Sequence, residues 1–156
     1  MIKIEIPGHK PIQAEHLVLD YNGTLAVDGL LKPGVQEILN SLAENISIHV
    51  ITADTFGKVK NELKEIHCEC IILNGNNQQG QKLSYIIKLG VEKVISIGNG
   101  MNDAMMLKNA ALGIAVIQKE GASIKALLNA EIVCTDIIDA LDLLRNNLRI
   151  IATLRN

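Results

Sequence analysis

The sequence is poor in aromatic residues and cysteine, and it has no long apolar run. It contains no tryptophan, one phenylalanine and two tyrosines among 156 residues, so its core must be built from aliphatic side chains. No apolar run approaches the roughly 18 residues of a membrane-spanning helix. The first ten residues, MIKIEIPGHK, lack the basic-then-apolar layout of a signal peptide. Three cysteines cannot all pair within one chain, which is typical of reduced thiols. The composition therefore predicts a cytoplasmic protein with no membrane segment.

Neither sign of charge dominates the chain. Fifteen Lys and Arg stand against 17 Asp and Glu, which gives a net charge of -2. Because there is no basic stripe and no polybasic patch, we expect no nucleic-acid partner and no attachment to a membrane surface. The length and a hydrophobic content of 48% are ordinary for a globular protein. We predict one domain over residues 1–156.

Short apolar runs alternate with helical patterns along the chain. A small β-hairpin is expected at about residues 1–14, and Pro33 is expected in the first turn of a helix. Further strands are predicted at 16–20, 46–52, 70–73, 93–97, 112–117 and 131–134. Further helices are predicted from a Thr55 cap to about 66, and at 79–89, 102–110, 121–129 and 136–146. This alternation predicts an α/β fold, a three-layer Rossmann-like parallel sheet with helices on both faces.

Polar residues follow these strands where a parallel sheet would bring them together, because ligands bind at the carboxyl ends of such strands. These residues are Asp20, Asn22-Gly23-Thr24, Thr52, Asp54 and the run 98–103, with Lys82 near the start of a helix. Two carboxylates are oxygen ligands for Mg²⁺. A hydroxyl, a lysine and turn amides suit a phosphoryl group. The convergence predicts phosphoryl transfer assisted by a metal.

Four short motifs resemble those of the haloacid dehalogenase superfamily, in that family's order and over about residues 16–135. They are D-x-N-G-T at 20–24, the strand-ending Thr52, Lys82, and G-N-G-M-N-D at 98–103. Within the superfamily, T-A-D at 52–54 and the run 98–107 are most similar to the phosphorylation domain of P-type ATPases. The resemblance implies a Mg²⁺-dependent phosphohydrolase that acts on a phosphorylated substrate.

The resemblance also implies a role for each matching residue. Asp20 would be the nucleophile and would form an aspartyl phosphate. Asp20, the backbone carbonyl of Asn22 and Asp103 would hold Mg²⁺. Thr52 would donate a hydrogen bond to a phosphoryl oxygen. Lys82 would neutralise charge where the nucleophile and the phosphate approach.

Two positions depart from the family pattern. Many phosphatases of the superfamily carry an aspartate at position 22 as general acid and base, but Asn22 cannot take a proton from water at neutral pH, and such help is worth roughly 100- to 10,000-fold. Asn99 stands where aspartate is usual. Its amide oxygen can still accept a hydrogen bond from a metal-bound water, but the site loses one formal negative charge, so we expect Mg²⁺ to bind more weakly. The alternative function is therefore a catalytically weakened binding or regulatory module. A dehalogenase needs no metal, and Asp103 would then be hard to explain.

The spacing between motifs excludes an inserted cap domain. Asp20 and Thr52 are 32 residues apart, and Thr52 and Lys82 are 30 residues apart. Residues 25–31 place Asp28-Gly29 where a hairpin turn would lie. Since capless relatives such as the octulosonate 8-phosphate phosphatases borrow cover from a neighbouring subunit, we expect a homo-oligomer, a dimer or a tetramer.

Several residues also have a purely structural interpretation. Asp54 is either close to the site or a cap of the next helix, and Lys82 could be a solvated helix lysine. His16 and His49 lie in predicted strands without a second ligand, which favours structural roles. The stretch 141–155 has helical spacing and either docks on the domain or pairs with another subunit.

Overall fold

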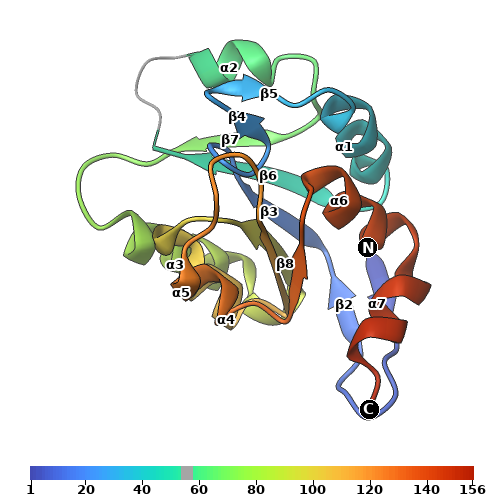
Figure 1. Ribbon diagram of the computed structural model, residues 1–156. Coiled ribbons are helices and arrows are strands. Elements are labelled where there is room, and N and C mark those ends of the chain that lie inside the picture. Colours follow the sequence, from blue (N-terminus) through green and yellow to red (C-terminus); the bar gives the residue numbers. More distant parts are fainter. Residues whose placement is uncertain (54–57) are drawn as a thin grey trace.

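The computed structural model describes residues 1–53 and 58–156, and its centre is a six-stranded sheet (Figure 1). The strand order is β10-β9-β8-β3-β6-β7, and each neighbouring pair is parallel. The strands are β3 (His16–Asp20), β6 (Ser47–Thr52), β7 (Glu69–Ile72), β8 (Val94–Gly98), β9 (Leu112–Val116) and β10 (Ile132–Cys134). Their runs of Val, Ile and Leu suit strands that are buried on both faces. The predicted parallel sheet is confirmed.

Helices cover both faces of the sheet, as predicted. They are α1 (Val35–Ala43), α2 (Lys58–Glu62), α3 (Gln78–Leu89), α4 (Ala104–Asn109), α5 (Ile124–Leu127), α6 (Ile137–Arg145) and α7 (Asn147–Leu154), with short 3₁₀ turns η1 (Val91–Lys93) and η2 (Met101–Asp103). In Figure 1, α1 and α6 lie on one side of the sheet and α3, α4 and α5 on the other. The two faces form separate clusters that are mostly aliphatic, but the prediction of a purely aliphatic core is wrong, because Tyr21 is fully buried in the larger cluster and Tyr85 packs against the other.

The beginnings of two helices differ from the sequence prediction. Pro33 was predicted inside the first turn of α1, but that helix begins at Val35, after Gly34 in a left-handed conformation with φ 85°. A left-handed φ is readily adopted only by glycine, so the chain turns there before the helix starts. The helix predicted at 121–129 is shorter, because Gly121 also has a positive φ and Ser123 caps α5 through the amide of Lys125.

Two antiparallel hairpins complete the fold. β1 (Ile2–Ile4) pairs with β2 (Ile12–Ala14), which confirms the hairpin predicted at about residues 1–14. β4 (Ala26–Val27) pairs with β5 (Leu30–Leu31) to form a small flap directly after β3. Asp28 and Gly29 form the turn of this flap, both with positive φ. The hydroxyl of Tyr21 donates to the Gly29 carbonyl over 3.1 Å, which ties the flap to the end of β3.

The C-terminal stretch docks on the domain. α6 ends before Asn146, and α7 follows as a separate helix whose Ile150 is buried in the main core. The side-chain amide of Asn147 donates to the carbonyl of Lys3 in β1 over 3.0 Å. The docking alternative is therefore the one that this chain adopts, although Leu148 is exposed on the outer side.

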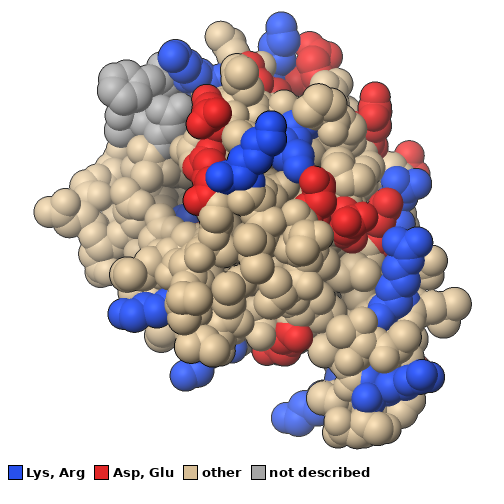
Figure 2. Space-filling view, viewed as in Figure 1, with Lys and Arg blue, Asp and Glu red and all other residues tan. Residues whose placement is uncertain are grey.

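Three further expectations from the sequence concern membrane-spanning helices, surface charge and the cysteines. In the part of the chain that the structure describes, no helix is long and apolar enough to cross a membrane. Figure 2 shows acidic and basic side chains interspersed over the face in view, with no broad patch of one sign. The three cysteines are half-buried and unpaired. Asp54 and Thr55 lie outside the described residues.

Candidate active site

A buried lysine bridges two aspartates at the carboxyl edge of the sheet. Lys82 Nζ lies 2.5 Å from Asp20 Oδ1 and 2.6 Å from Asp103 Oδ1. Lys82 and Asp103 have no exposed surface, and Asp20 is 7% exposed. These three residues come from β3, α3 and η2, so the fold gathers groups that are far apart in the sequence. The structure therefore brings together the proposed nucleophile, the proposed metal ligand and the proposed lysine.

Burial sets the electrostatics of this cluster. Burial and the nearby Asp103 carboxylate raise the pKa of Asp20 from 3.8 to about 7, while Lys82 and Thr24 oppose the shift. Burial alone would lower the pKa of Lys82, but its attraction to Asp20 and Asp103 outweighs burial and raises that pKa. The lysine therefore stays charged, and two ionised carboxylates would leave the cluster with one net negative charge.

Backbone amides hold Asp103 in place. Its Oδ2 accepts from the amides of Asn99 over 3.0 Å and Gly100 over 2.7 Å. A Cβ on Gly98 would lie 2.5 Å from Cγ of Asp103, so only glycine at the end of β8 allows the carboxylate to fold back against it. This explains one glycine of the motif at 98–103 by close packing rather than by phosphate contact.

Thr24 and Asn99 connect the Asp20 loop to the β8 end. Thr24 Oγ1 lies 3.1 Å from Asp20 Oδ2 and 3.1 Å from Asn99 Oδ1. A hydroxyl has one proton, so Thr24 donates to one of these oxygens at a time. Gly23 has φ 78°, and a Cβ there would lie 2.3 Å from Asn99 Nδ2. The Asn99 side chain is thus packed directly on the glycine of the D-x-N-G-T motif.

The other two predicted residues lie at the edge of this cluster. Asn22 is exposed, and its backbone bridges to Ala26. Thr52 is buried at the end of β6, one residue beyond Ile51, which pairs with Asp20 in the sheet. Both therefore lie on the strand ends around Asp20, which is where the sequence placed them.

Two residues in or beside this cluster were not predicted from the sequence to have a role. Thr24 lies in the D-x-N-G-T motif, and its hydroxyl contacts Asp20. Gln118 follows β9, and its amide nitrogen donates to the carbonyls of Gly23 and Thr24. One feature of the sequence could have indicated Gln118: it is a polar residue just after the carboxyl end of another strand, and ligands bind at this edge in such folds.

The donor set fits Mg²⁺ better than a metal that needs several protein side chains. Among residues 1–53 and 58–156, no group of three or more His, Cys, Asp or Glu side chains could hold a metal ion. Asp20 and Asp103 supply two carboxylates and a net negative charge, and Mg²⁺ is usually bound by one or two carboxylates with water and phosphate oxygens. Asn99 instead donates from Nδ2 to the Gly121 carbonyl over 2.9 Å, so its amide is engaged by the protein.

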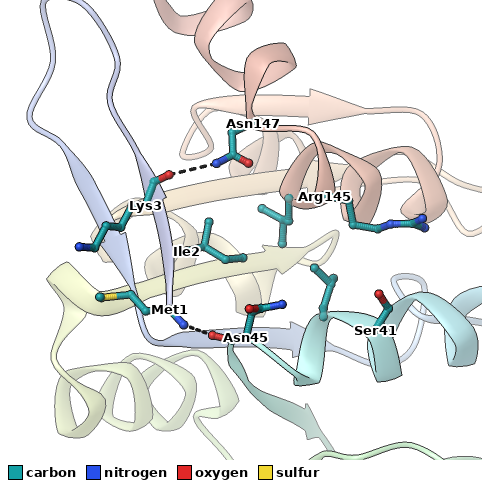
Figure 3. Close-up of a pocket in the computed structure, with 9 residues that line it drawn as sticks. Met1, Ile2, Lys3, Ser41, Asn45, Arg145 and Asn147 are labelled. Atoms are coloured by element: carbon teal, nitrogen blue, oxygen red, sulfur yellow. Dashed lines mark hydrogen bonds between the residues drawn. The ribbon is translucent and has the colours of Figure 1, made fainter.

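A separate pocket of about 410 Å³ lies at the other end of the sheet (Figure 3). It is lined by β1, the end of α1 just before β6, and the junction of α6 and α7. Figure 3 shows the side chains of Lys3 and Arg145 extending away from one another, so they do not converge on a ligand. Arg145 also pairs with Asp142 over 3.2 Å. The described residues that line this pocket include no carboxylate, so it does not repeat the pairing of lysine and aspartates at the strand ends.

Comparisons with known proteins agree with the geometry. The family model for haloacid dehalogenase-like hydrolases matches residues 72–137. An uncharacterized protein of Methanocaldococcus jannaschii is 57% identical over 65 residues, which cover 42% of this chain and 70% of that protein. A probable copper-transporting ATPase, HMA5 of Arabidopsis thaliana, is 28% identical over 129 residues, 79% of this chain but 13% of the ATPase.

Solved structures share the fold at low sequence identity. The 3-deoxy-D-manno-octulosonate 8-phosphate phosphatase of Moraxella catarrhalis, solved with magnesium, phosphate and KDO, has a TM-score of 0.72 at 18% identity and covers 92% of this chain and 95% of its own. The cobalt-bound phosphatase of Haemophilus influenzae has a TM-score of 0.73 at 12% identity, over 92% of this chain and 94% of its own.

Proposed function

Because the chain belongs to the haloacid dehalogenase superfamily, we propose that it is a Mg²⁺-dependent phosphohydrolase that acts through an aspartyl phosphate on Asp20. One observation carries the proposal: Lys82 bridges Asp20 and Asp103 inside the protein, at 2.5 and 2.6 Å. A buried cation between two carboxylates at the edge where such sheets bind ligands suits a site that handles concentrated negative charge.

The chain's own residues supply the steps. A carboxylate oxygen of Asp20 attacks phosphorus while the bond from phosphorus to the leaving oxygen breaks. Water then attacks the phosphorus of the aspartyl phosphate, releases inorganic phosphate and restores Asp20. In this proposal Lys82 offsets negative charge during both steps, and Thr52, which is buried at the end of β6, donates to a phosphoryl oxygen. The leaving oxygen takes its proton from water, because Asn22 has none to give.

Asp20, Asp103 and the backbone carbonyl of Asn22 would hold magnesium, which when bound would neutralise charge on the phosphoryl group. Because Asn22 cannot act as a general acid, the site favours a substrate with a good leaving group. Between β3 and α1 the chain inserts only the small β4–β5 flap, so no cap domain covers the strand-end site from there. We propose that a second subunit covers it in a cytoplasmic homo-oligomer, which light scattering after gel filtration would test.

The decisive experiment is hydrolysis of p-nitrophenyl phosphate with and without Mg²⁺. We expect turnover that needs Mg²⁺, that is abolished in Asp20→Asn, and that is unchanged in Asp139→Asn, an aspartate exposed on α6. Beryllium fluoride should bind the wild type and protect it from heat. Failure of both hydrolysis and beryllium fluoride binding would refute the proposal.

A weakened binding module remains the second candidate, and one contact favours it. Asn99 Nδ2 donates to the Gly121 carbonyl over 2.9 Å. An aspartate at 99 would place a carboxylate oxygen against that carbonyl and add negative charge near Asp20. The site therefore requires an amide at position 99. Under this alternative the wild type binds Mg²⁺ or phosphate without turnover.

The two departures from the family pattern can be tested separately. Asn22 is exposed, so the fold should accommodate Asn22→Asp. If the site lacks a general acid and base, this substitution should raise turnover by at least about 100-fold. Asn99→Asp should lower stability and leave turnover no higher. Efficient hydrolysis by the wild type would exclude the binding-module alternative.

A further inference from the structure

Gln118 forms the centre of a network between the Asp20 loop and the base of the flap. It lies in the β9 loop, defined here as residues 117–123. Its Nε2 donates to the carbonyls of Gly23 over 3.1 Å and Thr24 over 2.6 Å. Its Oε1 accepts from Lys32 Nζ over 2.8 Å and from the amide of Ile137 over 3.1 Å. A glutamine carboxamide has two N–H donors and one oxygen with two lone pairs, so every one of these positions is used.

The chemistry of its four partners fixes the orientation of this carboxamide. Gly23 and Thr24 present only carbonyl acceptors to it, while Lys32 and Ile137 present only donors. The opposite orientation would place donors against donors and acceptors against acceptors. Only glutamine at 118 satisfies both sides, since glutamate would face two carbonyls with a carboxylate oxygen and methionine would satisfy none.

The β9 loop is itself rigidly connected. The Gly121 amide donates to the Gln118 carbonyl over 2.8 Å, and Gly121 has φ 76°. The Gly121 carbonyl in turn accepts from Asn99 Nδ2, and the Ser123 amide donates to the Asn99 carbonyl over 2.8 Å. One loop after β9 therefore holds both the loop after β3 and the loop after β8.

We propose that Gln118 is a positioning residue for the proposed phosphohydrolase: its amide fixes the Gly23 and Thr24 carbonyls and so sets the placement of Asp20. The link to the reacting group is short, because Thr24 Oγ1 also contacts the Asp20 carboxylate at 3.1 Å. The neighbouring carbonyl of Asn22, on the same turn, is the proposed backbone ligand of Mg²⁺. This inference rests on the proposed function for its kinetic consequences and on the geometry alone for its structural ones.

The test compares Gln118→Glu with Gln36→Glu, which makes the same change at an exposed position of α1. A small misplacement of reacting groups costs up to about 100-fold in rate. We expect Gln118→Glu to lower kcat for p-nitrophenyl phosphate about 10- to 100-fold, with KM changed less than about threefold. Binding of Mg²⁺ measured by calorimetry should weaken as well. Gln36→Glu should leave all three quantities unchanged.

Hydrogen exchange of the loop amides gives a second readout that needs no turnover. In the wild type, the amides of Gly23, Thr24, Leu25 and Ala26 are hydrogen-bonded within the loop. We expect these amides to exchange at least about tenfold faster in Gln118→Glu while the strand amides keep their rates. If Gln118→Glu does not fold, Gln118→Met removes the same donors without adding charge and should show the same local increase.

The outcomes separate this inference from the proposed function. A wild type that hydrolyses p-nitrophenyl phosphate, with Gln118 variants at wild-type kcat and unchanged loop exchange, overturns the positioning role and leaves the function intact. A wild type without turnover counts against the function, and the exchange rates then decide the positioning role alone. A uniform drop in thermal stability with a normal kcat would reduce Gln118 to a structural residue and would also overturn the inference.

Discussion

Replacing Lys82 with methionine tests the central feature of this site. The change keeps most of the side-chain volume but removes the ammonium group. Lys82 has no exposed surface, and its Nζ makes two short ion pairs, to Asp20 and Asp103. Without it, two buried carboxylates face one another with no cation between them. Lys88 lies on the same helix but is exposed, so Lys88→Met is a matched control.

The expected size of the effect follows from burial. Removing one partner of a buried ion pair costs about 3–5 kcal/mol, because the remaining charge is left without compensation. For a domain of this length, each kcal/mol lowers the melting temperature by about 2–4 °C. We therefore expect Lys82→Met to lower it by about 6–20 °C. The exposed Lys88→Met should stay within about 0.5 kcal/mol of the wild type.

The assays are thermal melting, which gives the melting temperature, and chemical denaturation, which gives the free energy of unfolding, for both variants in buffer without added metal. A second substitution checks the cause. In the Lys82→Met background, Asp20→Asn removes one of the two facing charges and should raise the free energy of unfolding. In the wild-type background the same substitution also removes a partner of Lys82, so its gain should be smaller. Equal stabilities of Lys82→Met and Lys88→Met, or an equal or larger gain from Asp20→Asn in the wild-type background, would refute the reasoning.

Three further perturbations have defined outcomes. Gly113→Ala should destabilise by about 1–3 kcal/mol in urea unfolding, because the new Cβ would lie 2.3 Å from the Leu107 carbonyl oxygen; a stability equal to wild type would contradict the packing. Thr24→Val should reduce turnover about tenfold or more without unfolding the protein, since it removes a hydroxyl 3.1 Å from Asp20. Burial lowers the pKa of His49 below 6.5, so the free energy of unfolding should fall as the pH drops below that value, and His49→Gln should flatten the profile. The groups that face His49 are His16 from β3, Glu69 from β7 and Tyr85 from α3.

The sequence predicted the sheet and most of the strand-end cluster for a clear physical reason. Strands buried on both faces are near-continuous Ile, Val and Leu, so they stand out from the amphipathic helices. Once the strands are placed, Asp20 and the end of β8 must share an edge. The sequence alone does not distinguish Lys82 as a site residue from a solvated lysine on a helix surface, which is the more common case. Only the packing of α3 shows it to be buried.

What the sequence did not reveal depends on contacts between loops. Gln118 belongs to no motif, and its role appears only when Gly23 and Thr24 are seen to point their carbonyls at it. The end of α6 agrees with the helix predicted at 136–146, but the helical spacing of 141–155 continues through Asn146 and did not show that α7 follows as a separate helix. Periodicity reports which face is buried, but it does not report where the chain changes direction.

The two departures from the family pattern have different physical origins. Asn99 is fixed by contacts on both sides: its amide donates to Gly121, and its side chain packs on Gly23 where no Cβ would fit. Changing it alters the framework. Asn22 is exposed on the turn beside Asp20, so its side chain affects the chemistry without supporting the fold. In the proposed mechanism, the rate of phosphoenzyme breakdown should therefore change through position 22 alone, whereas Asn99 connects the loop after β8 to the β9 loop. If Asn22→Asp unfolds the protein and Asn99→Asp does not, this division is wrong.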